Sequence, residues 1–196
     1  LYPIRDADAV VGVPDSGAVA GHGYARSSGI DYHQWILRDR ERGQRTFIEP
    51  NSDIRRKLAL MKYIIDPNVD GMRIALVDDS IVRGLTQEVL VDGLLYFGAR
   101  SVDVLSCHPP IGFDCFYGMD ISTEKGLVAQ GRTMEETERF LTSNLRARSV
   151  HYLSVDQNAS TQGRPFHEMC YHCCNGDPRL PITTVRNKLA LEALVG

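Results

Sequence analysis

The stretch IALVDDSIVRGLTQ, Ile74 to Gln87, sets the architecture of this chain. The apolar run Ile74–Val77 has the length and composition of a strand buried on both faces. Asp78 and Asp79 follow it directly, and a turn containing Ser, Arg and Gly then leads into residues with helical spacing. The order strand, polar turn, helix is typical of a parallel α/β sheet, in which ligands bind beyond the carboxyl ends of the strands. We therefore expect both carboxylates at the edge of a binding site.

The rest of the chain continues this alternation of strands and helices. Strands are predicted at residues 9–13, 73–77, 101–106 and 150–155. Helices are predicted at residues 18–30, 86–99 and 134–144, with another that starts near residue 52 and carries Lys62. The pattern predicts an α/β domain over residues 1–160, with a twisted parallel sheet and helices on both faces. Residues 161–196 contain clustered Cys and Pro and are predicted to form a C-terminal extension.

Composition limits the classes of function. The 196 residues are 43% hydrophobic, enough for one globular domain with a core. A net charge of −3 gives no general attraction to nucleic acid or to an anionic membrane, and no apolar run is long enough to span a bilayer. Five cysteines, an odd number, and an N-terminus without a signal-peptide layout favour a reducing compartment, so we expect a cytoplasmic location.

The turn after Asp79 offers groups suited to a phosphate and a cation. Backbone N–H groups at a helix N-terminus form an anion site, and Gly84 lets the backbone approach a ligand closely. Ser80 and Thr86 add hydroxyl donors. A carboxylate pair suits vicinal hydroxyls or a divalent cation. A sugar phosphate with Mg²⁺ would therefore suit both the phosphate-binding turn and the carboxylate pair. The alternative is that Asp78 caps the helix and Asp79 is only solvated.

The whole string resembles the phosphoribosyl-diphosphate signature of type I phosphoribosyltransferases, and in detail that of the glutamine phosphoribosylpyrophosphate amidotransferase family. Other motifs of that family recur in the same order, over roughly residues 8–180. They are VVGVPDSGAVAGHGYARSSGI at 10–30, RTFIEP at 45–50, LMKY at 60–63, HPPIGFDCFYGMDISTEKGLVA at 108–129 and CYHCCNGDP at 170–178. The resemblance implies a type I phosphoribosyltransferase fold, with a small hood and a flexible loop at about residues 31–50.

The resemblance also implies roles for individual residues. Asp78 and Asp79 would contact the ribose hydroxyls and Mg²⁺, and Ser16 would belong to the same metal site. Arg45, in the flexible loop, and Lys62 would be the catalytic cations that stabilise the leaving pyrophosphate. The segment from Ser80 to Thr86 would hold the 5-phosphate. The implied substrate-binding set is Asp15, Ser16, Gly17, Asp78, Asp79, Ser80, Ile81, Val82, Arg83, Gly84, Leu85 and Thr86.

Two of these motifs also have simpler interpretations. The turn Pro14–Gly17 could be an ordinary tight turn. The charged run at residues 38–45 could be a solvated loop, although a loop that closes over a substrate must also be soluble when open.

The reaction implied by the resemblance is displacement of pyrophosphate from 5-phosphoribosyl 1-diphosphate by ammonia, which gives 5-phosphoribosylamine in the first step of de novo purine biosynthesis. In that family an N-terminal glutaminase domain supplies the ammonia from glutamine. The sequence begins just before the transferase part, so we expect no glutamine-dependent activity from this chain alone. It is then the C-terminal piece of a longer enzyme, an enzyme that uses free ammonia, or a protein that has lost the activity. The resemblance further implies inhibition by purine nucleotides and a homo-oligomer.

The chain departs from the family pattern at two places in the substrate site. Leu85 stands where the family usually has Thr, so one phosphate-binding hydroxyl is missing, at a cost of about 1 kcal/mol. In the flexible loop, Gln44 precedes Arg45, Gly43 lies one position early, and an aromatic residue typical of the family is absent. These changes put closure of the loop in question.

The cysteines indicate a second site. Cys170 and Cys173 form a C-x-x-C pair, which suits a metal bound by thiolates but is only half a site. The resemblance implies a 4Fe–4S cluster held by Cys115, Cys170 and Cys173, with a fourth ligand upstream of this chain. Zinc is the competing metal, and free thiols are the alternative. His167 and His172 could substitute as ligands, whereas Cys107 and Cys174 are interpreted as small buried residues and His108 receives no role.

Two other functions compete on the same fold. A nucleobase phosphoribosyltransferase would use the same sugar diphosphate, but it needs a base-binding hood that the sequence does not reveal. A regulator that senses phosphoribosyl diphosphate or nucleotides would usually carry a nucleic-acid-binding element, and no basic segment of that kind is present.

Overall fold

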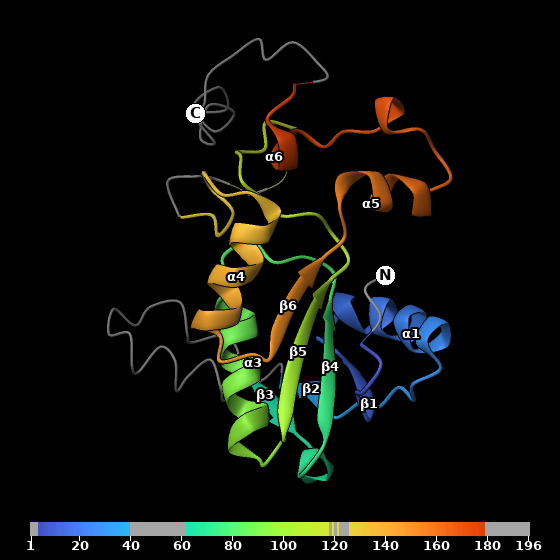
Figure 1. Cartoon of the computed structure of the whole chain (residues 1–196), viewed down its shortest axis with the longest axis vertical. Coiled ribbons are helices and arrows are strands. Elements are labelled where there is room, and N and C mark those ends of the chain that lie inside the picture. The colour runs from blue at the N-terminus through green and yellow to red at the C-terminus, as the bar shows by residue number, and fades with distance from the viewer. Residues whose placement is uncertain (1–3, 40–61, 118, 120, 122–125, 179–196) are drawn as a thin grey trace, which may run out of the picture.

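The computed structural model describes residues 4–39, 62–117, 119, 121 and 126–178. A four-stranded parallel sheet forms its centre, in the spatial order β1-β4-β5-β6 (Figure 1). The strands are β1 Ala9–Gly12, β4 Arg73–Asp78, β5 Ser101–Ser106 and β6 Ser149–Tyr152. All four predicted strands are confirmed. The last one is shorter than predicted, because Ser154 and Gln157 form a capping box that starts a helix, α5 Val155–Thr161.

The register of the sheet brings apolar side chains into rows. Val11 pairs with Leu76, Leu76 with Val104, and Val104 with Val150. All four are buried in the larger of the two main cores. Parallel strands that are buried on both faces read as continuous apolar runs, which is why these segments were recognisable from sequence.

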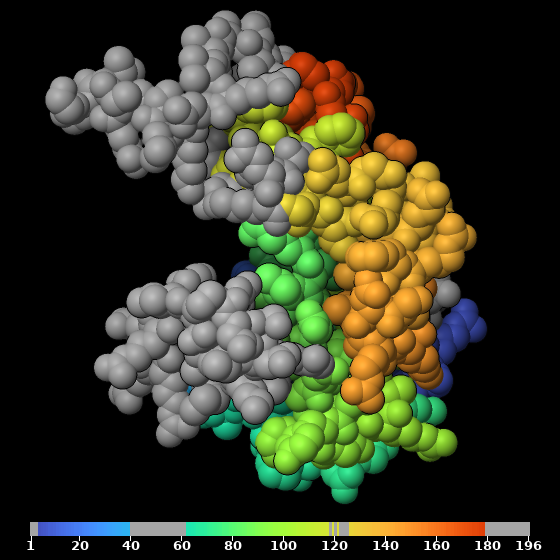
Figure 2. Space-filling view, turned by 90° about the vertical axis from the view of Figure 1, so that its left-hand side faces the viewer, coloured from blue at the N-terminus to red at the C-terminus, as the bar shows by residue number. Residues whose placement is uncertain are grey.

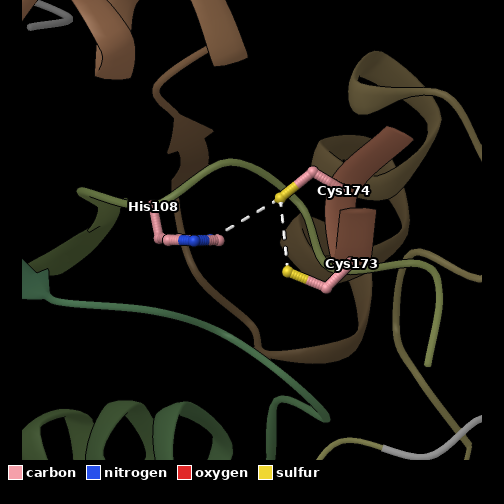
Figure 3. Close-up of side chains that lie close together, drawn as sticks. All are labelled: His108, Cys173 and Cys174. Carbon is pink, nitrogen blue, oxygen red and sulfur yellow. Dashed lines mark hydrogen bonds between the residues drawn. The ribbon is translucent and has the colours of Figure 1, made fainter. Parts of the chain in front are cut away.

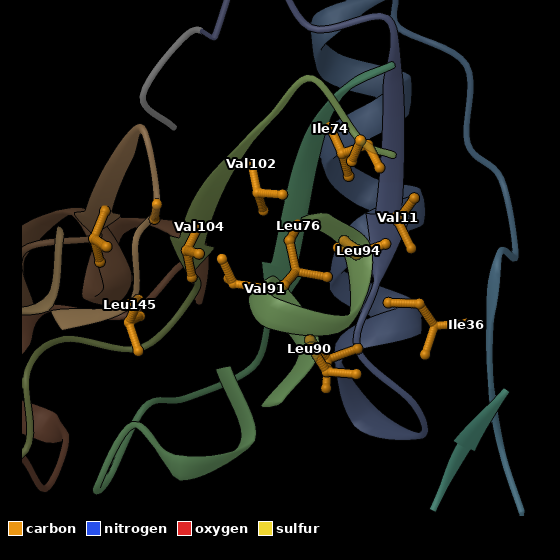
Figure 4. Packing of buried hydrophobic residues seen from close by; sticks show 14 of the residues in the cluster. Val11, Ile36, Ile74, Leu76, Leu90, Val91, Leu94, Val102, Val104 and Leu145 are labelled. Carbon is orange, nitrogen blue, oxygen red and sulfur yellow. The ribbon is translucent and has the colours of Figure 1, made fainter. Parts of the chain in front are cut away.

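Helices cover both faces of the sheet, as predicted. Helix α1 (Ser16–Ser28) lies on one face, where Tyr24 packs with Val10 and Ala75. Helices α3 (Leu85–Tyr96) and α4 (Met134–Asn144) lie on the other face. There Leu90 and Leu94 of α3 point toward Leu76 and Val11 in the close-up of the core (Figure 4).

A small antiparallel pair of strands lies beside the main sheet. Ile36–Arg38 (β2) pairs with Tyr63–Ile65 (β3), and Ile36 and Ile65 are buried in the larger core. Of the two strands, β2 lies within the predicted hood and β3 lies after it; the residues of the hood from 40 onward are outside the described ranges. The predicted helix near residue 52 also lies outside them, but its extension to Lys62 is wrong: Lys62 is in a turn, because the next three residues pair with β2.

The described C-terminal part lies beyond the carboxyl ends of the strands, where Figure 1 shows α5 and α6. It contains α5, the short 3-10 helix η4 (Phe166–Glu168) and α6 (His172–Asn175); a further 3-10 helix, η2 (Pro67–Val69), precedes β4. The carbonyl oxygen of Cys173 accepts hydrogen bonds from the backbone N–H groups of Gly112 and Phe113, at 2.9 and 3.0 Å. Within the described ranges, no helix has the length and apolar character needed to cross a membrane.

Candidate active site

The predicted substrate-binding residues gather at the carboxyl ends of β1 and β4. The turn at Asp15–Gly17 leads from β1 into α1, and Asp78 is the last residue of β4. The backbone N–H of Val13 donates to the carbonyl oxygen of Val77 at 2.8 Å, which holds the two strand ends together. In the space-filling view, part of the green segment that contains the start of α3 is visible at the surface (Figure 2).

The two aspartates have different environments. Asp78 is buried, and its carboxylate accepts hydrogen bonds from the backbone N–H of Asp79 at 2.9 Å and from the side-chain amide of Gln87. Burial, with the neighbouring Asp79 carboxylate as a lesser cause, raises the pKa of Asp78 to about 7. Asp79 is exposed. Asp79 is therefore the carboxylate available to a ligand, while Asp78 is a buried acid whose ionised form a nearby cation would stabilise.

Gly17 lets α1 begin directly against the end of β4. A Cβ atom at this position would lie 2.8 Å from the carbonyl oxygen of Val77 and 2.9 Å from Oδ1 of Asp78. Both distances are too short for real contacts, so no larger side chain fits without moving the strand end. The peptide bond between Pro14 and Asp15, just before this glycine, is cis. The close approach distinguishes this turn from an ordinary tight turn.

Two helix N-termini end at the site without side-chain caps. Neither Asp15, the N-cap of α1, nor Gly84, the N-cap of α3, makes a side-chain capping hydrogen bond. Gly84 has φ of 81°, a left-handed conformation that favours glycine. Backbone N–H groups in the first turn of a helix then bind water or an anion.

The segment before α3 is held by its apolar side chains. Ile81 is buried in the core, and Val82 packs against the cluster of Ile111, Ile121 and Leu127. Because the side chains of Ile81 and Val82 are packed in apolar clusters, only their backbone groups are suited to contact a phosphate. Arg83 lines a cavity with Phe140 and Leu141 of α4. Among the residues at the start of α3, Leu85 leaves 60% of its surface exposed and offers no hydroxyl.

Side chains of the small sheet approach the turn after β1 and the start of α3. A guanidinium nitrogen of Arg38 lies 3.9 Å from a carboxylate oxygen of Asp15. The backbone N–H of Asp39 donates to the carbonyl oxygen of Lys62 at 2.7 Å, which places Lys62 beside the end of β2. Burial lowers the pKa of Lys62, and the positive charge of Arg38 lowers it further. The Tyr63 side chain hydrogen-bonds to Thr86 of α3. Arg38 and Lys62 thus bring positive charge to the same edge as the aspartates. Arg45 lies outside the described residues.

Sequence analysis missed three residues of this site. Arg38, Tyr63 and Gln87 received no role, yet each contacts a predicted site residue. The position of Gln87 could have indicated its role. It lies in the first turn of α3, just after Gly84, and that turn faces the carboxyl end of β4.

The described residues contain a cluster of potential metal ligands that includes one of the predicted ligands, Cys173. Within the described ranges, one group of three potential metal ligands has its ligand atoms all within 4.8 Å of one another: His108, Cys173 and Cys174. The two sulfurs lie 3.9 Å apart, and Nδ1 of His108 lies 3.9 Å from the sulfur of Cys174 (Figure 3). A hydrogen bond between the two thiols lowers the pKa of Cys173 to about 7 and raises that of Cys174.

The other predicted ligands lie outside this group. Cys115 packs beside Cys173 on one apolar cluster, but its sulfur accepts a hydrogen bond from the backbone N–H of Tyr117 at 3.4 Å. Cys170 is exposed. His172 is buried and faces the ring of Phe116. Cys174 and His108 were missed because their proximity depends on the fold, although His108 follows a buried strand just as Asp78 does.

Comparisons with known proteins agree with the resemblance seen in the sequence. No protein-family profile matches the chain. Amidophosphoribosyltransferase 1 of Arabidopsis thaliana, described as chloroplastic, is 36% identical over 188 residues, or 93% of this chain and 32% of that protein. The amidophosphoribosyltransferases of Synechocystis and Bacillus subtilis are each 38% identical, over 95% and 87% of this chain and 37% and 36% of their own lengths. The chain therefore spans about a third of the relatives that it matches.

Solved structures match over a similar share. Glutamine phosphoribosylpyrophosphate amidotransferase from B. subtilis, in complex with ADP and GMP, aligns with a TM-score of 0.75 and 35% identity, covering 91% of this chain and 40% of that one. A structure described as the allosteric regulatory enzyme of purine biosynthesis gives a TM-score of 0.77 and 34% identity, covering 92% and 40%. By sequence and by fold, this chain is a relative of part of the amidophosphoribosyltransferases, and its fold is that of their phosphoribosyltransferase domain.

Proposed function

We propose that this chain transfers the 5-phosphoribosyl group of phosphoribosyl diphosphate to ammonia, with release of pyrophosphate. The observation that carries the proposal is the meeting, at one sheet edge, of the Asp78–Asp79 pair, two uncapped helix N-termini and the cations Arg38 and Lys62. The relatives, which are amidophosphoribosyltransferases, support the same reaction.

Each part of the substrate has a matching part of the site. The backbone N–H groups at the start of α3 would bind the 5-phosphate, since Gly84 provides no side chain to cover them. Asp79 would accept hydrogen bonds from the ribose hydroxyls. The turn at Ser16 and the side chains of Arg38 and Lys62 would bind the diphosphate, where cations stabilise the charge that grows as the bond breaks.

Residues present at this edge fit Mg²⁺. Asp78, Asp79 and the hydroxyl of Ser16 are hard oxygen donors of the kind that magnesium prefers. When bound, the ion would supply positive charge to the departing diphosphate oxygens. A cation beside the buried Asp78 would also favour the ionised form of this acid.

The bond changes balance without a protein nucleophile. The nitrogen lone pair of ammonia forms the new bond to C1 of the ribose, and the bond from C1 to the diphosphate oxygen breaks with its electron pair on that oxygen. One proton of the ammonium product passes to water. The protein residues bind and orient the two reactants, which accounts for much of the acceleration in reactions of this kind.

Further properties are proposed by extension from the relatives. One matching structure is a complex with ADP and GMP, which supports purine nucleotides as inhibitors of this chain. Closure of the loop that contains Arg45, release of ammonia from glutamine by a separate domain, a homo-oligomer, and a cytoplasmic location are predictions of the same kind. So is the 4Fe–4S cluster, whose three predicted ligands do not form one group within the described residues.

The proposal is tested by pyrophosphate release from phosphoribosyl diphosphate and Mg²⁺ with three acceptors: ammonium, glutamine and a mixture of nucleobases. We expect release with ammonium, none above background with glutamine, and loss of activity when EDTA removes the metal. Release that requires a nucleobase would identify a nucleobase phosphoribosyltransferase instead. Tight binding of phosphoribosyl diphosphate by calorimetry, without turnover of any acceptor, would support the sensing function and contradict the proposal.

A further inference from the structure

Asn158, one turn into α5, joins two segments that lie far apart in the sequence. Its side-chain amide nitrogen donates to the carbonyl oxygen of Cys107 at 2.8 Å, and its Oδ1 accepts from the hydroxyl of Tyr171 at 2.8 Å. A backbone carbonyl can only accept, so the amide nitrogen must face Cys107, and the amide oxygen is left for the tyrosine. The side chain of Asn158 therefore bridges the segment after β5 and the start of α6.

On the β5 side, this bridge reaches the substrate edge. The backbone N–H of Cys107 donates to the carbonyl oxygen of Asp78 at 3.0 Å. That carbonyl belongs to the peptide unit that links Asp78 to Asp79, and the N–H of the same unit donates to Oδ1 of Asp78 at 2.9 Å. Burial raises the pKa of the Cys107 thiol, and the negative charges of both aspartates raise it further. Because the peptide unit joins the two aspartates, its orientation affects the positions of both carboxylates.

On the α6 side, the bridge ends at a well-held tyrosine. Tyr171 is buried, and its ring stacks with that of Phe166 at 5.6 Å between ring centroids. Its carbonyl oxygen accepts hydrogen bonds from the backbone N–H groups of Cys174 and Asn175, at 2.8 and 3.0 Å, at the start of α6. Asn158 therefore receives its hydrogen bond from a donor that the C-terminal part fixes in place.

We propose that Asn158 is a positioning residue of the phosphoribosyl-transfer site, which couples the packing of the C-terminal part to the orientation of the Asp78–Asp79 peptide unit. The inference rests on the proposed function, since it assigns Asn158 a role in that reaction. Helix α5 suits this role because it starts directly after β6, and Figure 1 shows it beyond the carboxyl ends of the strands. Asn158 acts through Cys107 and does not need to contact the substrate.

A bridge that only stabilised the fold would affect the reaction differently. Loss of folded protein lowers the amount of active enzyme and so the apparent kcat, but it leaves the KM of the remaining molecules unchanged. A shift of the Asp79 carboxylate weakens binding of the ribose hydroxyls and therefore raises the KM for phosphoribosyl diphosphate. The two Michaelis constants, for phosphoribosyl diphosphate and for ammonium, separate a positioning role from a purely structural one.

Steady-state kinetics with Mg²⁺ and ammonium compare the parent chain with three variants. Asn158→Ala should raise the KM for phosphoribosyl diphosphate about fivefold, the factor that one hydrogen bond is worth. Its kcat and its KM for ammonium should stay within about twofold of the parent, the range of ordinary context effects. Tyr171→Phe removes only a hydroxyl and should shift the same KM by a smaller factor. Gln162→Ala, at an exposed position at the end of α5, is the control and should match the parent.

A double variant tests the order of the contacts. Tyr171 is inferred to act on the substrate edge only through Asn158. The combination of Asn158→Ala with Tyr171→Phe should therefore match Asn158→Ala alone within about twofold, rather than multiply the two effects.

The backbone amide resonance of Asp79 in NMR spectra provides a second measurement, without substrate or turnover. This N–H belongs to the peptide unit that Cys107 holds. The resonance should move in Asn158→Ala, move less in the same direction in Tyr171→Phe, and keep its position in Gln162→Ala. Circular dichroism checks that each variant is folded, and Tyr171→Phe provides an independent variant if Asn158→Ala fails to fold.

Two results with an active parent chain would overturn the inference. One is a KM for phosphoribosyl diphosphate that Asn158→Ala leaves unchanged, including the case in which only kcat falls. The other is an Asp79 resonance that keeps its parent position in Asn158→Ala. An inactive parent chain would contradict the proposed function instead, and the Asp79 resonance would then decide whether Asn158 positions this peptide unit.

Discussion

Gln87 donates a hydrogen bond from its side-chain amide to the carboxylate of Asp78, and both side chains are buried, at 3% and 5% exposure. The contact joins the end of β4 to the first turn of α3. It satisfies one oxygen of Asp78, while the backbone N–H of Asp79 satisfies the other. The position of the Asp78 carboxyl group therefore depends on Gln87. Gln87 can act in this way without touching the proposed substrate.

Gln87→Leu should destabilise the protein and weaken substrate binding. The substitution leaves one oxygen of Asp78 buried without its partner, which costs about 1–3 kcal/mol. Urea unfolding and calorimetric titration with phosphoribosyl diphosphate and Mg²⁺ measure the two effects. Gln130→Leu, at an exposed position, is the control and should change the free energy of unfolding by less than about 0.5 kcal/mol. Equal effects of the two substitutions would contradict the role of Gln87.

Asp78→Asn should change how stability depends on pH. The pKa of Asp78 is raised from 3.8 to about 7, so between these values the folded state keeps a proton that the unfolded state has lost. Ionisation of Asp78 therefore removes stability as the pH rises from about 4 to about 7. The variant has no charge to bury, so its free energy of unfolding relative to the parent should rise over that window. The gain has an upper limit on the order of 4 kcal/mol.

Denaturant unfolding at several pH values between 4 and 8, in the absence of divalent cations, measures this difference. Asp31→Asn, at an exposed position, is the matched control and should show no comparable trend. A difference between Asp78→Asn and the parent that stays constant over the whole range would show that Asp78 titrates normally.

Gly17→Ala should abolish substrate turnover. The added methyl group would meet the carbonyl oxygen of Val77 and the carboxylate of Asp78, so α1 or the end of β4 must move. Gly23→Ala lies on the same helix, with nothing within 4 Å of the added Cβ, and should stabilise the protein by about 0.5–1 kcal/mol. Measurements of kcat/KM and of unfolding temperature for both variants distinguish the steric effect at Gly17 from a general effect of alanine on the helix. Full activity of Gly17→Ala would contradict the described geometry.

Leu85→Thr should improve substrate binding. Leu85 is 60% exposed at the start of α3, so replacing it loses little packing and adds a hydroxyl donor where the 5-phosphate is proposed to bind. One such hydrogen bond is worth about 1 kcal/mol, which corresponds to roughly fivefold in affinity. Calorimetry with phosphoribosyl diphosphate measures the change, and Val19→Thr on the exposed side of α1 serves as the control. Unchanged affinity for Leu85→Thr would place the phosphate elsewhere.

The sequence predicted those parts of the fold that depend on local pattern. The strands β1, β4, β5 and β6 are apolar runs, and Asp78 and Asp79 follow one of them, so their place at the sheet edge follows from topology alone. Gly17 was assigned to the site through the resemblance of the VPDSG turn to a family motif, and not from topology.

The parts that the sequence did not predict depend on contacts between distant segments. The strands β2 and β3 have three residues each and pair across more than twenty residues of chain, so neither shows a clear period. Arg38 reaches the site only through that pairing. His108 and Cys174 are 66 positions apart and meet only because α6 packs against the segment after β5. Side-chain partners of this kind cannot be read from spacing.

The most direct test of the central claim is the rate of pyrophosphate release from phosphoribosyl diphosphate and Mg²⁺ as the ammonium concentration is raised. Asp79→Asn and Arg38→Gln serve as site variants, and Arg164→Gln, at an exposed position near η4, as the control. We predict that the rate of the parent chain rises with ammonium, and that the two site variants fall at least ~10-fold in kcat/KM, which corresponds to about 1.4 kcal/mol of lost transition-state stabilisation. A rate that does not depend on ammonium, or that is equal in all four proteins, would contradict the assignment of this sheet edge as a phosphoribosyl-transfer site.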